Sequence, residues 1–232
     1  MMRRYLVGLI LIGLAFALFP LLRQAGVAEA PGPLASAYLE NSADDFGAAN
    51  VVTAIVVSYR GFDTLGEVAV LFAATAGVGT LLTRRRLGKA VPPPGRQGGT
   101  EVLETASRLL AGLLIMFGAY IFIHGHLTPG GGFQGGVVVA VALLLGLLAK
   151  PDAQVSHRVM TTLESLSGAV YVGLGLLGIV LAGGFLDPRA LPLGVVGQLF
   201  SAGSIPLIYS MIGLKVGAEL SGIIDALKGD RS

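Results

Sequence analysis

Residues 108–150 read RLLAGLLIMFGAYIFIHGHLTPGGGFQGGVVVAVALLLGLLAK, and this stretch decides the fold class. Two apolar runs, Leu109 to His124 and Gly135 to Ala149, flank a glycine-rich segment that contains one proline. Proline and glycine interrupt helices, whereas each apolar run covers most of a hydrocarbon core about 30 Å thick. The stretch therefore predicts two membrane-spanning helices joined by a tight loop.

The rest of the chain continues this pattern. Of its 232 residues, 53% are hydrophobic and only 13% are charged, and the mean hydropathy is +0.77. Soluble domains carry about 25% charged residues, so a soluble fold is excluded. Four further apolar segments are long enough to span: Tyr5 to Leu22, Leu65 to Thr83, Leu163 to Gly183 and Gly194 to Ala218. We expect an all-α, polytopic membrane protein with about six transmembrane helices.

One more apolar segment, Ala48 to Tyr59, has only 12 residues. A spanning helix needs about 20 residues, so this segment predicts a short re-entrant or interfacial helix. Counting it as a full span would also place the basic run at 84–89 outside the cell, against the charge pattern of the chain.

The basic residues indicate the orientation in the cell (cytoplasmic) membrane. With a cytoplasmic N-terminus, twelve Lys and Arg residues lie on the cytoplasmic side and three on the other, which predicts that both termini are cytoplasmic. The net charge of +2 is too small to indicate a nucleic-acid partner. The twelve are Arg3, Arg4, Arg84, Arg85, Arg86, Lys89, Arg96, Arg108, Lys150, Arg158, Lys228 and Arg231, and the three are Arg23, Arg60 and Arg189.

The first span has a second interpretation as a signal peptide. Arg3 and Arg4, the apolar run and the small residues at 28–30 follow the order of the three signal-peptide regions. The run has 18 residues, however, and a signal core usually has about 7 to 15. We therefore expect a retained helix, with cleavage as the alternative.

Residues 84–100 read RRRLGKAVPPPGRQGGT, and three consecutive prolines with flanking glycines cannot continue a helix. We predict a cytoplasmic linker at 84–104 between a two-span module, 1–83, and a four-span module, 105–232. A fusion of two small membrane subunits would have this organisation. A plain cytoplasmic loop explains it equally well.

Ionisable residues inside a bilayer are costly and often mark ion paths. Asp63 and Glu67 are four residues apart at the start of the second span, so they share a helix face. Carboxylates there can relay protons or coordinate Na⁺. Alternatively they satisfy the free N–H groups of a helix start, an explanation that suits Asp63 better than the deeper Glu67.

The last span contains a second pair, Lys215 and Glu219, again four residues apart. This pair predicts either an interfacial anchor whose lysine reaches the headgroups or a proton-transfer couple. Glu164, at the cytoplasmic start of the fifth span, is a further ion-path candidate or a simple boundary charge.

His124 and His126 flank Gly125 at the outer end of the third span, where they predict a titratable entrance or a structural hydrogen-bonding role. Cysteine is absent, which excludes disulfides, thiolate metal sites and iron–sulfur ligation. With only three histidines, a closed zinc site would need ligands from elsewhere. We expect no cofactor, no metal and no catalytic residue.

Two motifs carry a family resemblance. HGHLTPGGGFQGG, His124 to Gly136, with the preceding RLLAGLLIMFGAYIFI, resembles the MnhB/MrpB subunit of multisubunit Na⁺/H⁺ antiporters and its MbhF-like counterpart in membrane-bound hydrogenases. NVVTAIVVSYRGFDTLGEVAVLF, Asn50 to Phe72, resembles the small hydrogenase subunit MbhE and the C-terminal segment of the MrpA subunit.

The resemblance implies a non-catalytic subunit of an Mrp-type module that exchanges Na⁺ and protons, either alone or within a hydrogenase-like or related respiratory complex. Its partners would be other subunits of that complex and the lipid bilayer. Asp63 and Glu67 become the leading transport candidates, with His124 and His126 second. The alternatives are a purely structural scaffold, or an independent secondary transporter, which would need a second broken helix to match the one at 48–61.

Overall fold

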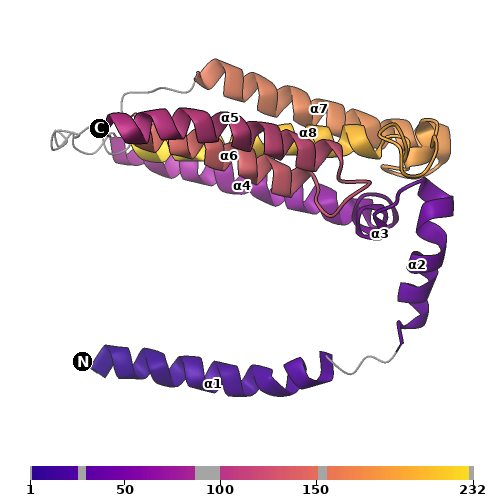
Figure 1. Cartoon of the computed structure of the whole chain (residues 1–232), viewed down its shortest axis with the longest axis horizontal. Coiled ribbons are helices and arrows are strands. Elements are labelled where there is room, and N and C mark those ends of the chain that lie inside the picture. The colour runs from indigo at the N-terminus through magenta and orange to yellow at the C-terminus, as the bar shows by residue number, and fades with distance from the viewer. Residues whose placement is uncertain (1, 26–29, 87–99, 151–155, 230–232) are drawn as a thin grey trace. The chain divides into compact units, whose positions relative to one another are not determined.

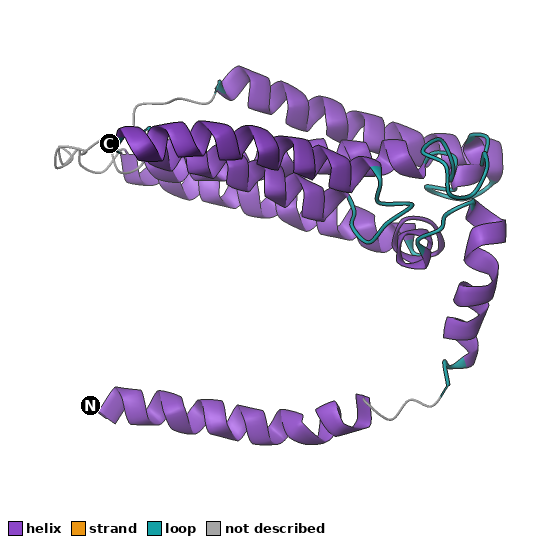
Figure 2. Ribbon diagram, in the orientation of Figure 1, coloured by secondary structure: helices purple, strands orange, loops and turns teal. Residues whose placement is uncertain are grey.

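The computed structural model describes residues 2–25, 30–86, 100–150 and 156–229, and all regular structure in these ranges is helical (Figure 2). The described chain forms two compact units, Met1–Glu40 and Asn41–Ser232. The prediction of an all-α fold is therefore confirmed.

The first unit contains α1 (Met2–Ala25) and the beginning of α2 (Pro33–Phe46). α1 covers the first predicted span, with a shorter apolar stretch at Tyr5–Pro20. Sequence patterns did not reveal α2, because its 14 residues mix apolar, polar and acidic side chains and contain no long apolar run. Pro33 suits the first turn of a helix, where the missing N–H is not needed.

The second unit contains five helices that are long and apolar enough to cross a membrane, which Figure 1 shows packed as a bundle. Together with the apolar stretch of α1, they confirm a polytopic membrane protein. The five are α4 (Gly61–Arg86), α5 (Glu101–Ile123), α6 (Gly132–Ala149), α7 (His157–Ala182) and α8 (Ile205–Gly229). Within this unit, α5 and α7 begin at the end of the bundle where α4 and α8 finish, which we call the linker end. The opposite end, with the loops after α5 and α7, we call the loop end.

Two predicted boundaries are wrong. The last predicted span begins at Gly194, whereas the residues up to Ser204 form a loop and the helix starts at Ile205. Gly194 and Gly203 adopt φ angles of 65° and 55°, which a right-handed helix does not allow. At the other boundary, α4 continues to Arg86, inside the predicted linker. The following linker residues, 87–99, lie outside the described part of the chain.

A short helix occupies the predicted position between α2 and α4. It consists of α3 (Val51–Thr53), followed by a π-helix, η1 (Ala54–Tyr59). Ala54 and Val57 are fully buried, so the segment packs into the core of the second unit.

α8 is the central helix of the second unit. It packs against α4, α5, α6 and α7, and 56% of its apolar window is buried, against 11% to 39% for the other four spanning helices. Its buried apolar residues follow helical spacing and form one stripe: Ile205, Ile208, Ile212 and Val216. Because α4 also packs on α8, both predicted modules contribute to this core. The module boundaries themselves stay a prediction.

Glycines bring α5, α6 and α8 into backbone contact. A Cβ atom at Gly118 would lie 2.8 Å from the carbonyl oxygen of Gly135, and one at Gly135 would lie 2.6 Å from that of Gly118. A Cβ atom at Gly136 would lie 2.7 Å from the carbonyl oxygen of Gly213. Only glycine fits these crossings, as is common where membrane helices approach closely.

Gly135→Ala should lower the free energy of unfolding by about 1 to 3 kcal/mol, because the added methyl group meets backbone that has no room to move. Thermal unfolding of the full-length chain in detergent, followed by circular dichroism, measures the effect. Gly146→Ala in the same helix is the matched control, since nothing lies within 4 Å of a Cβ atom there. Equal melting temperatures for the two variants would contradict the close α5–α6 contact.

Candidate functional site

Two charged side chains are buried one turn apart in α8. The Nζ atom of Lys215 lies 2.5 Å from Oε1 of Glu219, and the side chains are 9% and 0% exposed. The spacing of four residues lets the pair form within one helix. Both groups are enclosed by the chain itself, whereas an interfacial anchor would expose the ammonium group.

The pair lies where α4 and α7 face α8. The ring of Phe72 in α4 lies under the Lys215 ammonium, 5.4 Å from Nζ to the ring centroid. Gly168 of α7 leaves room for this ammonium, because a Cβ atom there would already lie 3.8 Å from Nζ. Glu164, one turn before Gly168, is close enough for its charge to act on Glu219. The site therefore combines one ammonium and two carboxyl groups from two helices.

Glu219 keeps one oxygen free. Its Oε2 atom is buried and has no hydrogen-bond partner among the described residues. A buried carboxylate oxygen without a partner is unfavourable in an apolar interior. Glu219 is consequently suited to accept a proton at this oxygen.

Asp63 and Glu67 share a face of α4, but they have different partners. Asp63 forms an ion pair with Arg60, 2.6 Å between Oδ2 and Nη2, and both side chains are more than half exposed. This surface pair in the first turn of α4 fits the stabilisation of a helix start. Glu67 is exposed in the isolated chain, and its charge acts on the hydroxyl groups of Tyr171 in α7 and Tyr209 in α8.

The two predicted histidines do not form one site. His124 places its ring on Tyr120, with 4.2 Å between the ring centroids, and its Nδ1 atom lies 3.1 Å from the Tyr120 carbonyl oxygen. His126 is fully buried, and its Nε2 atom lies 3.4 Å from the carbonyl oxygen of Gln198 in the α7–α8 loop. Among the described residues, no group of three His, Asp or Glu side chains could hold a metal ion. Nor does any hydrogen bond or ion pair within those residues link Glu67 or the histidines to Lys215 and Glu219.

Burial lowers the pKa of His126 below its ordinary value of 6.5. Hydrogen bonds with the backbone of Gln198 and Leu199 oppose this shift, while the neighbouring charge of His124 adds to it. A neutral imidazole that bridges two loops favours the structural role over a titratable entrance.

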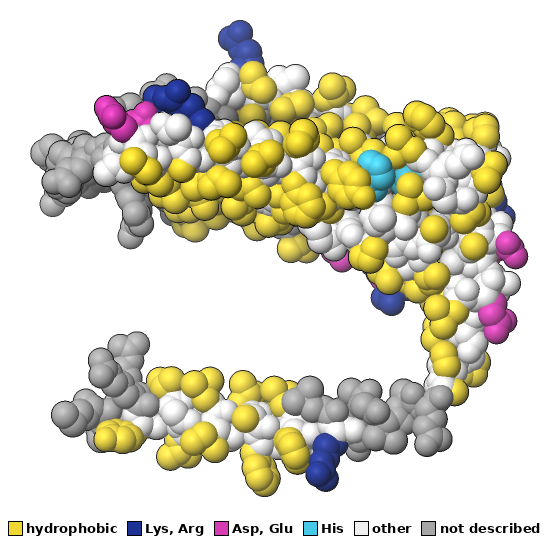
Figure 3. Space-filling model, viewed as in Figure 1, with side chains coloured by type: hydrophobic (Ala, Val, Ile, Leu, Met, Phe, Trp, Pro, Cys, Tyr) yellow, Lys and Arg dark blue, Asp and Glu magenta, His cyan; other side chains and the backbone are white. Residues whose placement is uncertain are grey.

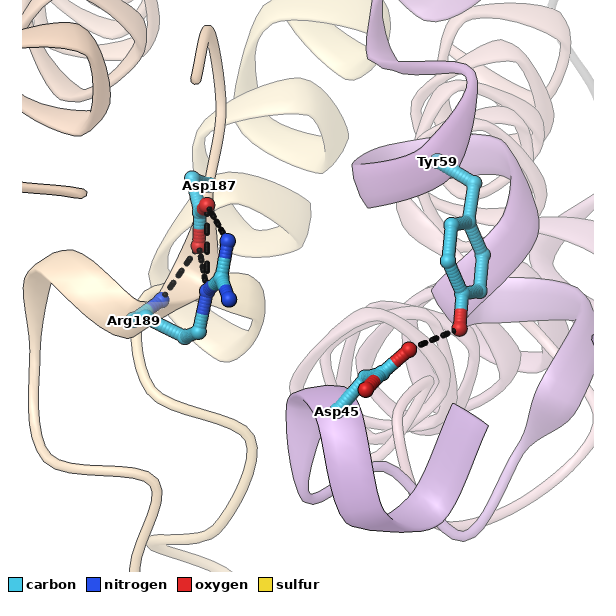
Figure 4. Close-up of polar contacts among 4 residues, drawn as sticks. All are labelled: Asp45, Tyr59, Asp187 and Arg189. Atoms are coloured by element: carbon cyan, nitrogen blue, oxygen red, sulfur yellow. Dashed lines mark hydrogen bonds and ion pairs between the residues drawn. The ribbon is translucent and has the colours of Figure 1, made fainter. Parts of the chain in front are cut away.

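A second polar cluster, shown in Figure 4, was not predicted from the sequence. Asp187 caps the 3₁₀ helix η2 (Pro188–Ala190) by accepting a hydrogen bond from the backbone N–H of Arg189, and its carboxylate also pairs with the Arg189 guanidinium. Tyr59 donates a hydrogen bond of 2.5 Å to Asp45. Burial raises the pKa of Asp187, but the hydrogen bonds and charge of Arg189 outweigh it and lower the pKa overall. An aspartate directly before proline, as a capping signal, was the clue available in the sequence.

The outside of the bundle is largely apolar. Figure 3 shows hydrophobic side chains covering most of the visible face of the helices, including α5. Large residues such as Leu109, Met116 and Val180 are 67% to 78% exposed in the isolated chain. Exposed apolar helices around an enclosed ion pair define a multi-pass membrane protein with polar groups in its interior.

Comparison with known families names the type of membrane protein. A domain described as related to the MnhB subunit of Na⁺/H⁺ antiporters matches residues 102–222, and the chain belongs to this family. A second family, MbhE, which belongs to the complex MBH, matches residues 3–97. Both resemblances inferred from the sequence motifs are therefore confirmed, and the chain is a fused subunit of the MnhB and MbhE type.

Solved structures and relatives agree with this assignment. A chain of the membrane-bound sulfane sulfur reductase, an archaeal respiratory membrane complex, is 42% identical with a TM-score of 0.78, and the match covers 98% of both chains. A chain of the Mrp complex from Dietzia sp. DQ12-45-1b is 26% identical with a TM-score of 0.75, over 98% of this chain and 26% of that one. A probable K⁺/H⁺ antiporter A/B protein of Rhizobium meliloti is 32% identical over 55% of this chain, which spans 15% of that longer protein.

The lowered pKa of His126 predicts a loss of stability in acid. The unfolded chain binds the proton more readily than the folded one, so this contribution is complete above the ordinary pKa of 6.5 and is lost as the pH falls toward the folded value. His126→Gln should therefore show a smaller drop in melting temperature between about pH 8 and about pH 5 than the native chain. His124→Gln is the control and should keep the native pH dependence. An unchanged profile for His126→Gln would contradict the prediction.

Proposed function

We propose that this chain is a non-catalytic subunit of an Mrp-type Na⁺/proton antiporter module within a larger membrane complex of the respiratory type. The support is its membership of the MnhB-related family together with relatives in an Mrp complex and an archaeal respiratory complex. Its partners are the other subunits of that complex, the lipid bilayer, Na⁺ and H⁺. Redox chemistry, where the complex has it, belongs to other subunits, because this chain contains no cysteine to ligate a cluster.

The buried pair of Lys215 and Glu219 carries the proposal. Charges at membrane depth cost about 2.5 to 3.5 kcal/mol each on insertion scales. A buried ion pair rarely repays its desolvation, and well-packed apolar side chains of similar size often stabilise a protein more. Stability therefore does not account for the pair, whereas transfer of a charge through the bundle does.

The geometry suggests how the pair acts. A proton that reaches the free Oε2 atom of Glu219 neutralises the carboxylate and weakens its hold on the ammonium of Lys215. The ring of Phe72 then remains as a partner for that ammonium by a cation–π interaction. Glu164 lies nearer the linker end of α7 and offers the next carboxylate. Proton transfer at Glu219 is thus coupled to movement of a positive charge.

Glu67 lies nearer the loop end, and we assign it to a second part of the same path. Its carboxylate is exposed in the isolated chain, where a neighbouring subunit of the complex would cover it. Its charge acts on the hydroxyl groups of Tyr171 and Tyr209, so it is oriented toward the bundle interior. Asp63, already paired with Arg60 at the surface, stays a weaker candidate.

The chain is further proposed to consist of two fused modules, 1–83 and 105–232, joined by a cytoplasmic linker at 84–104. The family matches to residues 3–97 and 102–222 support this division. The bias of basic residues supports cytoplasmic N- and C-termini, and hence a cytoplasmic linker end of the bundle.

Single-cysteine variants test this orientation without background, because the chain has no cysteine of its own. A membrane-impermeant thiol reagent applied to intact cells should label Val195→Cys, which is 62% exposed in the α7–α8 loop. It should label Ser156→Cys, exposed at the start of α7, only after the membrane is permeabilised. The reverse pattern would overturn the proposed orientation.

Glu219→Gln should reduce cation-dependent proton transport by the purified complex in vesicles about tenfold or more, because the amide cannot carry the proton. Glu67→Gln should also reduce transport. The measurement is a pH-sensitive dye inside vesicles driven by a Na⁺ gradient, after equal assembly has been confirmed by subunit composition.

Glu101→Gln provides the matched control for this experiment. Glu101 is an exposed carboxylate in the first turn of α5, outside the proposed path, and its variant should transport normally. Normal transport by both Glu219→Gln and Glu67→Gln would reduce the chain to a structural scaffold.

A further inference from the structure

A single asparagine joins the two family matches at the loop end of the bundle. The Nδ2 atom of Asn50 donates hydrogen bonds to the carbonyl oxygens of Gly125 at 2.8 Å and Thr128 at 2.9 Å. Its backbone N–H donates to the carbonyl oxygen of His126 at 3.0 Å. Asn50 thus holds three carbonyl groups of the α5–α6 loop, 75 or more residues away in sequence.

The same side chain starts the short helix that follows it. The Oδ1 atom of Asn50 accepts hydrogen bonds from the backbone N–H groups of Val52 and Thr53 and caps α3. One amide therefore fixes both the position of the segment and the direction of its first turn, with its donor and its acceptor serving separate tasks.

Thr53 extends the contact into the bundle. Its hydroxyl group donates to the carbonyl oxygen of Gly125 at 2.6 Å and accepts a hydrogen bond of 3.2 Å from the hydroxyl group of Tyr209 in α8. Both hydrogen bonds are buried. Buried hydrogen bonds of this kind are expensive to lose, because the remaining groups find no water.

Close packing surrounds these hydrogen bonds. A Cβ atom at Gly61 would lie 3.2 Å from the side chain of Leu186, and the ring of Phe62 stacks on that of Phe185 at 4.9 Å between centroids. Nearer the start of the segment, Gly47 packs on the α7–α8 loop. Residues 47–62 therefore fit a surface made by the loop after α5, the loop after α7 and α8. We call this contact the joint.

The joint is remote from the covalent connection. It lies at the loop end of the bundle, whereas α4 ends at Arg86 and α5 begins at Glu101, both at the linker end. Residues 47–62 fall within the MbhE match, and the surface they contact falls within the match to the MnhB-related domain. Two bodies that meet through matched polar and apolar contacts do not need a peptide bond to stay together.

We infer that the joint is a self-sufficient subunit interface: the 47–62 segment would hold the two parts of the chain together as separate polypeptides, with Asn50 as the residue that determines the fit. The inference concerns assembly and does not depend on the proposed transport path.

Cleavage of the assembled chain tests the inference. A recognition sequence for a site-specific protease is inserted between Gly98 and Gly99, and the full-length chain with a C-terminal tag is purified alone in detergent. After cleavage, the tagged fragment is recovered at a series of dilutions, and the bound N-terminal fragment is measured. The native joint should retain the N-terminal fragment across the series.

Asn50→Asp separates the two tasks of the side chain. The carboxylate still caps α3, but it cannot donate to Gly125 and Thr128, and its charge faces their carbonyl oxygens. The apparent dissociation constant of the cleaved fragments should rise about tenfold or more. Val52→Ala is the control, because Val52 is 66% exposed beside Asn50 and contributes nothing to the joint.

Both parts of the inference can fail. Release of the N-terminal fragment from the cleaved native chain at all dilutions would show that the linker, not the joint, holds the two parts together. Equal retention by the native chain and Asn50→Asp would remove Asn50 as the determinant. The uncut variants report on folding, since each should elute as a single species before protease is added.

Discussion

An ion pair inside a membrane bundle has to be surrounded by protein, because lipid offers neither hydrogen bonds nor a high dielectric constant. The Lys215 and Glu219 pair imposes this requirement on α8, and the four other spanning helices meet it by packing around that helix. The glycines that let α5 and α6 approach α8 make the enclosure close enough to exclude solvent. The central position of α8 and the glycine crossings therefore belong to one physical solution.

Sequence reasoning predicted the features that depend on local spacing. The lengths of the apolar runs located the spanning helices, and a separation of four residues was enough to place Lys215 beside Glu219. Local spacing could not predict that the pair is enclosed, since enclosure depends on α4 and α7, far away along the chain. Gly194 begins a loop for a related reason: the residues after it are apolar enough for a helix, and only the backbone angles reveal the break.

The histidines show the same limit at the site. His124 and His126 are adjacent to the same glycine, yet one stacks on its own helix and the other is buried against the α7–α8 loop. Turn geometry decides which way each side chain points, and the sequence of a glycine-rich loop leaves that geometry open. Asn50 likewise belongs to a motif that the sequence made visible, but its partners lie across the bundle and no spacing rule connects them to it.

The glycine crossings also limit how this protein can move. If α6 slid along α5 or α8 by part of a turn, a side chain would replace Gly118, Gly135 or Gly213 at a contact where only hydrogen fits. Shear between these three helices is therefore blocked, and they act as one rigid block. α7 meets Lys215 of that block at Gly168 through ordinary contact distances, with space left over. Any rearrangement that accompanies ion movement must then occur at α4 or α7, the two helices that border the charged pair.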